Sequence, residues 1–301
     1  MIIIKMITQN DLIEMTIINN NIKLNVITHY IETTERIIIH IHGIRSHFQS
    51  IYSCMNEIHE RFNTLVPYNI KSYALELRGH GKSEGIRCHI NNFDEFISDL
   101  HALITHIKTV YPLTPIYLLG ESMGGAIAIK YTIVYPYVAS GVILLAPMFG
   151  MPKESDIPFY KAYPLMALSY VLPTWGIIPY KPEKSCCYVK YLNAKRINKY
   201  QYNAPLRLGI GRECFITMRW LNEHKQKFIT PFVAFHSKID PVTDINHTRL
   251  FVDGCGATNK KLIELADGNH TLFVPLDCDD VQPHIIMMEI IDWIISVYSN
   301  K

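Results

Sequence analysis

The sequence IYLLGESMGG at Ile116–Gly125 decides the fold of this chain. Its first four residues follow Pro115 and are typical of a buried strand in a parallel sheet. The apolar run that starts at Met123 opens with several small residues and predicts a helix up to Tyr135. Between strand and helix lies Ser122, in the pattern G-x-S-x-G. Strand, sharp turn and helix together indicate a nucleophile elbow, in which the serine hydroxyl is exposed above the sheet.

The alternative is a glycine-rich turn with an incidental serine. The elbow requires little bulk on either side of the serine, because the strained turn brings its neighbours against the adjoining helix and strand. Gly120 and Gly124 meet that requirement, so the sequence favours the elbow.

Composition limits the class of protein. A chain of 301 residues with 49% hydrophobic and 19% charged residues can bury a large core, and we expect one domain over residues 1–301 that carries an insertion. The net charge of +2 gives no basic field for nucleic acid. Seven cysteines without a C-x-x-C pair predict neither a disulfide framework nor a zinc site. We therefore expect no metal and a reducing, cytoplasmic environment, and Lys5 and Gln9 interrupt the apolar start of the chain well short of a secretory or membrane segment.

Strand-like and helical runs alternate along the chain, after a hairpin with a turn at Asn19–Asn21. This alternation predicts an α/β fold with a mostly parallel, doubly wound sheet. The expected strands are 15–18, 22–27, 36–41, 72–77, 116–119, 142–145, 232–235 and 261–265, and the expected helices are 48–62, 93–110, 123–135 and 283–298.

The interval from Pro147 to about Thr230 breaks the alternation. It is rich in proline and contains an aromatic and apolar stretch, Phe159–Trp175. We interpret residues 148–229 as a cap inserted into the domain over the active site.

A serine hydroxyl is a poor nucleophile near neutral pH, so it needs a base and a carboxylate that orients the base. Asp240 and His270 each lie in a loop that follows a predicted strand, and such loops converge at one edge of a parallel sheet. Together with Ser122 they give the chain order serine, acid, histidine, which predicts a catalytic triad.

Other residues could fill the same roles. Asp244 and Asp267 are alternatives for the acid, and His236 is an alternative for the base. Asp267 lies close in sequence to His270, however, and His236 precedes the proposed acid. Taken alone, Asp240 could simply form a turn and His270 could be an ordinary loop histidine.

The oxyanion hole needs two backbone N–H groups, one after the nucleophile and one from the loop after an earlier strand. Met123 supplies the first group and Ile44 the second, directly after the strand that ends at Ile41. Gly43 allows close approach of the backbone, and we expect His42 to support this loop, not to transfer protons.

These residues resemble the monoglyceride lipase and lysophospholipase-like group of α/β-hydrolases, and in particular its poxvirus-encoded members. The resemblance runs from about Arg36 to the C-terminal helix. The segment RGHGKSEG at 78–85 is specific to this group, whereas the elbow is common to many hydrolases. The other matching residues are His42-Gly43, His47, Gly120–Gly125, Asp240-Pro241 and His270.

The resemblance implies an α/β-hydrolase fold and cleavage of monoacylglycerol to fatty acid and glycerol, without a cofactor. It also implies a cap that contacts membranes transiently and admits the lipid, for which Phe159–Trp175 is suited; ordinary packing inside the cap is the alternative. Lysophospholipase or broad carboxylesterase activity remains open, as does a non-catalytic interaction protein. Ser122 excludes epoxide hydrolases and dehalogenases, which need aspartate at the elbow.

The chain departs from the family pattern beside the proposed oxyanion hole. Arg45 and Ser46 stand where the family has glycine and glutamate, Ser50 stands where it has arginine, and Glu121 stands where animal members have histidine. We expect Arg45 and Glu121 to line the substrate site. Arg45 either contacts a phosphate, which would suit a lysophospholipid, or is a solvated surface residue.

Overall fold

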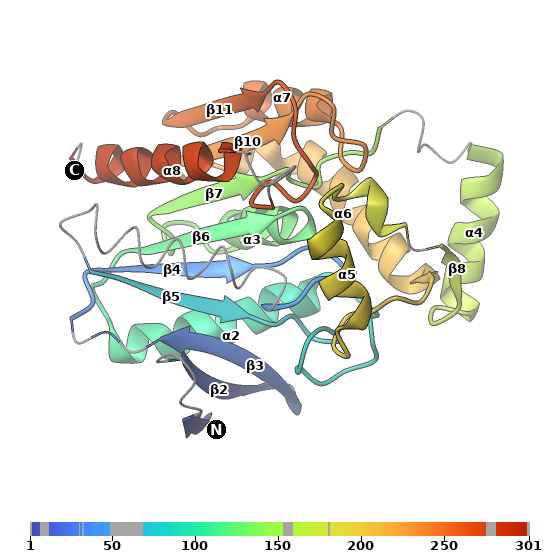
Figure 1. Ribbon diagram of the computed structural model, residues 1–301, viewed down its shortest axis with the longest axis horizontal. Coiled ribbons are helices and arrows are strands. Elements are labelled where there is room, and N and C mark those ends of the chain that lie inside the picture. Colours follow the sequence, from blue (N-terminus) through green and yellow to red (C-terminus); the bar gives the residue numbers. More distant parts are fainter. Residues whose placement is uncertain are drawn as a thin grey trace.

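The centre of the molecule is a twisted sheet of nine strands in the described part of the chain (Figure 1). The computed structural model describes residues 2–6, 12–29, 31, 33–48, 69–152, 159–179, 181–274 and 281–299. The strand order across the sheet is β1-β2-β3-β5-β4-β6-β7-β10-β11. The strands are β1 (Ile2–Met6), β2 (Leu12–Asn19), β3 (Ile22–His29), β4 (Arg36–Ile41), β5 (Ile70–Leu75), β6 (Ile116–Glu121), β7 (Gly141–Leu145), β10 (Phe232–Ser237) and β11 (Lys260–Leu265).

The two parts of the sheet differ in strand direction. β1, β2 and β3 are antiparallel to their neighbours, and the six strands from β5 to β11 are parallel. Asn20 and Asn21 join β2 to β3 with φ angles of 49° and 62°. Two successive left-handed residues give the turn whose twist suits a tight hairpin, and asparagine tolerates that conformation well.

Helices cover both faces of the sheet. In β4, Ile37 and Ile39 pack into the core beneath α2 (Asp94–Val110), α3 (Met123–Val134) and α6 (Leu208–His224), whereas Ile38 packs into the core beneath α8 (Gln282–Ser299). Alternate side chains of a strand point to opposite faces, so a strand covered on both sides must be apolar throughout. This explains why β4 reads as a continuous apolar run.

The predicted α/β class and the mostly parallel, doubly wound sheet are confirmed. The predicted strand 36–41 coincides with β4, and the predicted strand 72–77 lies two residues earlier, as β5. The strand ends at Leu75, because the next residue, Glu76, uses its carboxylate to accept hydrogen bonds from loop backbone groups of Phe48 and Lys82. The predicted helix 48–62 lies outside the described residues, apart from its first residue.

The segment between β7 and β10 lies beyond the carboxyl ends of the parallel strands (Figure 1). It contains α4 (Phe159–Val171), β8 (Gly176–Ile178), α5 (Val189–Ile197), β9 (Leu206–Arg207) and α6. The last helix differs from the others, because Ile210, Cys214 and Leu221 of α6 belong to the same core as α3. The boundaries of the cap, 148–229, stay a prediction, and we refer below to α4, β8 and α5 as the outer cap.

The order of the strands marks one position on the sheet. The chain runs from β4 to β5 on one side and later returns to β6 on the other side of β4. Ligands of doubly wound sheets bind at such a switch point, outside the carboxyl ends of the strands. The loop after β4 and the elbow after β6 both lie at this position. No helix of the described residues has the length and apolar character needed to cross a membrane.

Candidate active site

Ser122 occupies a strained turn between β6 and α3. Its φ and ψ angles are 54° and −115°, a conformation that residues with a side chain seldom adopt. Backbone hydrogen bonds hold the turn: Ser122 N–H donates to the Leu145 carbonyl over 2.9 Å, and the Ser122 carbonyl accepts from Met148 N–H over 3.1 Å. A Cβ on Gly124 would collide with the Ile41 carbonyl, so only glycine fits there. The sequence motif therefore forms the elbow that it predicts.

Asp240 and His270 meet at the carboxyl ends of β10 and β11. His270 Nδ1 lies 2.8 Å from Asp240 Oδ2. The carboxylate also accepts hydrogen bonds from Val242 N–H over 2.7 Å, and from the backbone N–H and hydroxyl of Thr243 over 3.1 and 3.0 Å. Four donors around one carboxylate fix both its charge and its orientation.

The pKa of Asp240 follows from these contacts. Burial alone would raise it, but the charge interaction with His270, the contact with His236 and the hydrogen bonds from His270 and Val242 outweigh burial and hold the pKa far below its ordinary value. The carboxylate is therefore ionised throughout the neutral range and accepts the Nδ1 proton of His270. In that tautomer His270 Nε2 has a free lone pair, as a general base requires.

The alternative residues serve other purposes. Asp244 caps α7 (Ile245–Gly254) by accepting from Asn246 N–H over 2.9 Å, and exposed Asp267 accepts from Gln282 Nε2 over 3.3 Å. His236 is fully buried, with Nδ1 2.8 Å from the Thr248 hydroxyl and Nε2 3.4 Å from Asp240 Oδ2. It contacts the proposed acid from the interior of the protein.

The loop after β4 lies against the nucleophile. A Cβ on Gly43 would stand 3.2 Å from Ser122 Cβ and 3.8 Å from its Oγ, so the backbone that precedes Ile44 approaches the serine closely. His42 holds this loop. Its Nε2 must accept, because Leu77 N–H donates to it over 3.1 Å, and its Nδ1 therefore donates to the Gly43 carbonyl over 2.8 Å.

Both nitrogens of His42 are thus committed to the backbone. Burial, and then the neighbouring His80, lower the pKa of His42 well below its ordinary value, so the ring is neutral. A neutral ring with no free nitrogen supports the loop and transfers no protons, in agreement with the expectation from the sequence.

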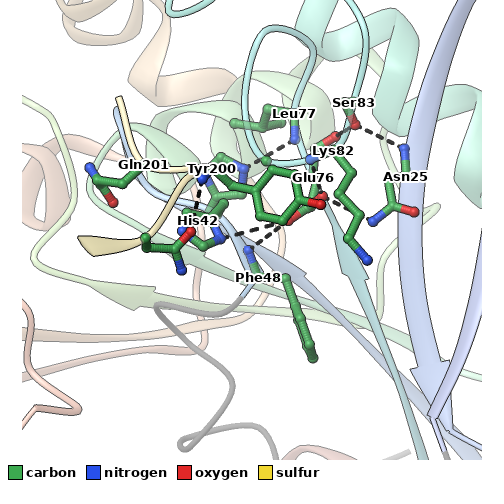
Figure 2. Close-up of polar contacts among 12 residues, drawn as sticks. Asn25, His42, Phe48, Glu76, Leu77, Lys82, Ser83, Tyr200 and Gln201 are labelled. Carbon is green, nitrogen blue, oxygen red and sulfur yellow. Dashed lines mark hydrogen bonds and ion pairs between the residues drawn. The ribbon is translucent and has the colours of Figure 1, made fainter. Parts of the chain in front are cut away.

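The family-specific segment 78–85 and the chain after the β4 loop are bonded to the same side chain, Glu76 (Figure 2). The buried carboxylate of Glu76 accepts from Asn25 Nδ2 over 2.9 Å, Lys82 N–H over 2.6 Å and Phe48 N–H over 3.2 Å. A Cβ on Gly81 would overlap that carboxylate, which explains the glycine. Glu76 therefore connects this segment to the chain that follows the β4 loop.

Arg45 is directed at the outer cap. Its φ is 61°, its Nη2 donates to the Ile178 carbonyl over 3.2 Å, and its own carbonyl accepts from Gln201 Nε2 over 2.6 Å. The side chain is buried, so the solvated alternative is wrong. Its role toward substrate stays a prediction.

Glu121 lies beside Ser122 and is only 9% exposed. Burial raises the pKa of Glu121, and interactions with His270 and with Lys195 of α5 lower it in part. Lys195 was not singled out by the sequence, because one lysine on a short cap helix has no pattern that distinguishes it from a surface charge. Among the described residues no cluster of His, Cys, Asp or Glu is arranged to hold a metal ion.

A serine on an elbow, a histidine bonded to an aspartate, and a mostly parallel sheet define a serine hydrolase of the α/β-hydrolase fold. The sequence profile of the family described as serine aminopeptidase, S33, matches residues 32–277. The chain belongs to this family.

Individual relatives make the similarity more specific. The chain is 33% identical to monoglyceride lipase of Rattus norvegicus over 245 residues, which cover 80% of this chain and 77% of that protein. It is 22% identical to a monoglyceride lipase homolog of Monkeypox virus over 221 residues, or 72% of this chain and 76% of that protein. A soluble variant of monoglyceride lipase from Saccharomyces cerevisiae, solved with a substrate analog, has the same fold, with a TM-score of 0.78, 16% identity and 94% coverage of each chain. The resemblance seen in the sequence is confirmed, and the chain is a hydrolase of the lipase and esterase type.

Proposed function

We propose that the protein cleaves monoacylglycerol to fatty acid and glycerol through an acyl-enzyme on Ser122. The observation that carries this proposal is the 2.8 Å contact between His270 and Asp240, at the same edge of the sheet as the Ser122 elbow. Similarity to proteins named monoglyceride lipase supports the choice of substrate.

The proposed reaction begins when His270 Nε2 accepts the proton of the Ser122 hydroxyl as its oxygen attacks the ester carbonyl. The carbonyl oxygen becomes an oxyanion, which accepts hydrogen bonds from the backbone N–H groups of Met123 and Ile44. As the intermediate collapses, the bond to the glycerol oxygen breaks and His270 gives its proton to that oxygen. Asp240 stays ionised and stabilises the imidazolium.

Water completes the cycle. His270 accepts a proton from the water as the water oxygen attacks the acyl-enzyme, and the proton returns to the Ser122 oxygen as fatty acid leaves. Each half of the reaction uses the same three side chains and the same two N–H groups.

The outer cap suits a lipid substrate. Large apolar side chains are exposed on and after α4, where a soluble protein normally buries most of them. They are Tyr163, Tyr170, Val171, Leu172, Trp175 and Ile178, with Tyr163 71% and Val171 75% exposed. We propose that this surface, here called the apolar cap surface, contacts membranes transiently while the rest of the protein stays in the cytoplasm.

Two measurements test the proposal. A fluorophosphonate probe should label the purified protein, with the label on Ser122 by peptide mapping and absent from Ser122→Ala. Monoacylglycerol should then be turned over faster than lysophosphatidylcholine and a short-chain ester. Faster turnover of the lysophospholipid would reassign the substrate, and lack of labelling would favour a non-catalytic interaction protein.

A further inference from the structure

Glu121 is an unusual residue to find beside a nucleophile. It ends β6, the residue is only 9% exposed, and its carboxylate accepts no hydrogen bond from any described residue. Buried carboxylates are normally paired or hydrogen-bonded, because the loss of hydration is costly. A carboxylate left open next to Ser122 is therefore available to a ligand.

The outer cap brings a cation, Lys195 of α5, within electrostatic reach of this carboxylate. The segment before α5 is bonded to the loop of the base, where Cys187 N–H donates to Asn269 Oδ1 over 2.9 Å and Thr271 N–H donates to the Ser185 carbonyl over 3.1 Å. The segment after α5 is bonded to the β4 loop, where Gln201 Nε2 donates to the Arg45 carbonyl. α5 is thus fixed between the base and the proposed oxyanion hole.

Lys195 lies on this fixed helix and interacts electrostatically with Glu121, Cys186 and Arg45. Burial lowers the pKa of Lys195, and the negative charge of Glu121 opposes that effect. Within the described residues the two side chains do not form a direct ion pair, and the Lys195 ammonium contacts the Tyr191 ring at 5.5 Å. The two opposite charges therefore lie near enough to interact electrostatically without forming an ion pair.

The carboxylate of Glu121 and the ammonium of Lys195 together favour one kind of ligand. A hydroxyl group both donates and accepts, so an alcohol with several hydroxyls can donate to the carboxylate and accept from the ammonium. A phosphate would be attracted by Lys195 but repelled by Glu121, and a quaternary ammonium would be attracted by Glu121 but repelled by Lys195, so neither ligand suits both groups. The acyl chain of a lipid is apolar, and its contact with either charged group would be unfavourable because that group would lose hydration without gaining a hydrogen bond.

We propose that Glu121 and Lys195 form the binding site for the leaving alcohol and that this site takes an uncharged alcohol with more than one hydroxyl group. The inference rests on the ester hydrolysis proposed above. The proposed alcohol site lies near the base, as the reaction requires: His270 must deliver a proton to the alcohol oxygen, and Glu121 interacts with His270.

The test compares two esters of the same fatty acid, 1-monooleoylglycerol and methyl oleate, in the same detergent micelles. Glu121→Gln and Lys195→Met should each lower the ratio of kcat/KM for the glycerol ester to that for the methyl ester about tenfold, the effect of losing a hydrogen bond to a charged group. Lys190→Met is the matched control, because Lys190 is exposed on the same helix, and it should leave the ratio unchanged.

A third ester, 1-oleoyl lysophosphatidate, tests the sign of the charges. Relative to monooleoylglycerol, its turnover should rise in Glu121→Gln, where an unopposed cation remains, and fall in Lys195→Met. An equal fall in kcat/KM for all three esters would overturn the inference, since Glu121 and Lys195 would then affect ester hydrolysis in general and not the binding of the alcohol.

The same experiment separates this inference from the function on which it rests. If the unsubstituted protein cleaves none of the esters, ester hydrolysis itself is refuted. If it cleaves them and the ratio does not move in either variant, only the alcohol site is refuted.

Discussion

The end of the sheet and the outer cap differ in how their polar groups are satisfied. At the sheet, Asp240 accepts from four donors and His42 uses both ring nitrogens. At the boundary with the cap, Glu121 is buried without a hydrogen bond from any described residue, and Lys195 interacts with it electrostatically but forms no ion pair with it among those residues. Groups that are fully bonded hold a fixed geometry, whereas groups left open are available to a ligand. We infer that residues at the end of the sheet carry out the reaction, and that residues at the boundary with the cap select the alcohol.

The largest expected effect is at the elbow. Ser122→Ala should lower kcat/KM for monoacylglycerol by about 10⁴-fold or more, because the nucleophile cannot be replaced by its neighbours. The melting temperature should stay close to that of the unsubstituted protein. Steady-state kinetics with a thermal melt checks both, and substantial residual turnover would assign the nucleophile elsewhere.

Asp240→Asn should lower kcat by about 10³- to 10⁴-fold, because an amide no longer fixes the tautomer of His270. Asp244→Asn is the matched control, since Asp244 caps α7 and lies outside the proposed triad. We expect the control to keep its activity and to lose a little stability. If the two variants behaved alike, the acid would have to be sought at another carboxylate.

His42→Ala should lower kcat about 10- to 100-fold with little change in KM, because the loop that carries Ile44 loses both of its imidazole hydrogen bonds. His40→Gln is the control: His40 is an equally buried histidine two residues earlier, within β4, and its Nε2 lies 3.3 Å from the Ser72 hydroxyl. Stability should fall in both variants and kcat only in the first. A fall in kcat of the same size in both would attribute the effect to the core of the sheet.

The apolar cap surface should give a smaller effect. Val171→Ser combined with Trp175→Ser should weaken binding to phosphatidylcholine vesicles about tenfold, as expected from the loss of two partly inserted apolar side chains. Tyr137→Ser is the control, since Tyr137 is 84% exposed in the loop after α3, outside the cap. Vesicle sedimentation measures the binding, and equal binding of all three proteins would remove this surface as the membrane contact.

The smallest effect concerns pH. Burial raises the pKa of Glu121 in the folded state, so this group favours the folded state at low pH and costs stability as pH rises through that pKa. Glu121→Gln removes the cost and should raise the melting temperature by about 1–3 °C at pH 8, with no gain at pH 4. A melting temperature that rises equally at both pH values would show that charge is not the cause.

The sheet could be predicted from the sequence because its strands are buried on both faces. β4 and β7 are short apolar runs with clear limits, and the elbow, Asp240 and His270 follow from chain order once the strands are known. The helix α7 was not predicted, although Asp244 is a typical N-cap residue that could have revealed it.

The outer cap could not be predicted in the same way. α4 contains Pro164 and exposes much of its apolar surface, so its pattern has no clear helical period. α5 buries Leu192 as its one fully buried residue among those described, which leaves the positions of Lys195 and its neighbours to tertiary contacts. Arg45 was recognised as a departure from the family, but its contacts with Ile178 and Gln201 required the fold.

The anchoring of α5 has a mechanical consequence. The helix is tied at one end to the loop of His270 and at the other to the loop of Ile44, so it connects two parts of the site that the sheet holds on separate strands. A helix fixed at both ends cannot swing away as a hinged lid would. We expect a shift of the base loop to be passed through α5 to the β4 loop, so that the base and the proposed oxyanion hole move together.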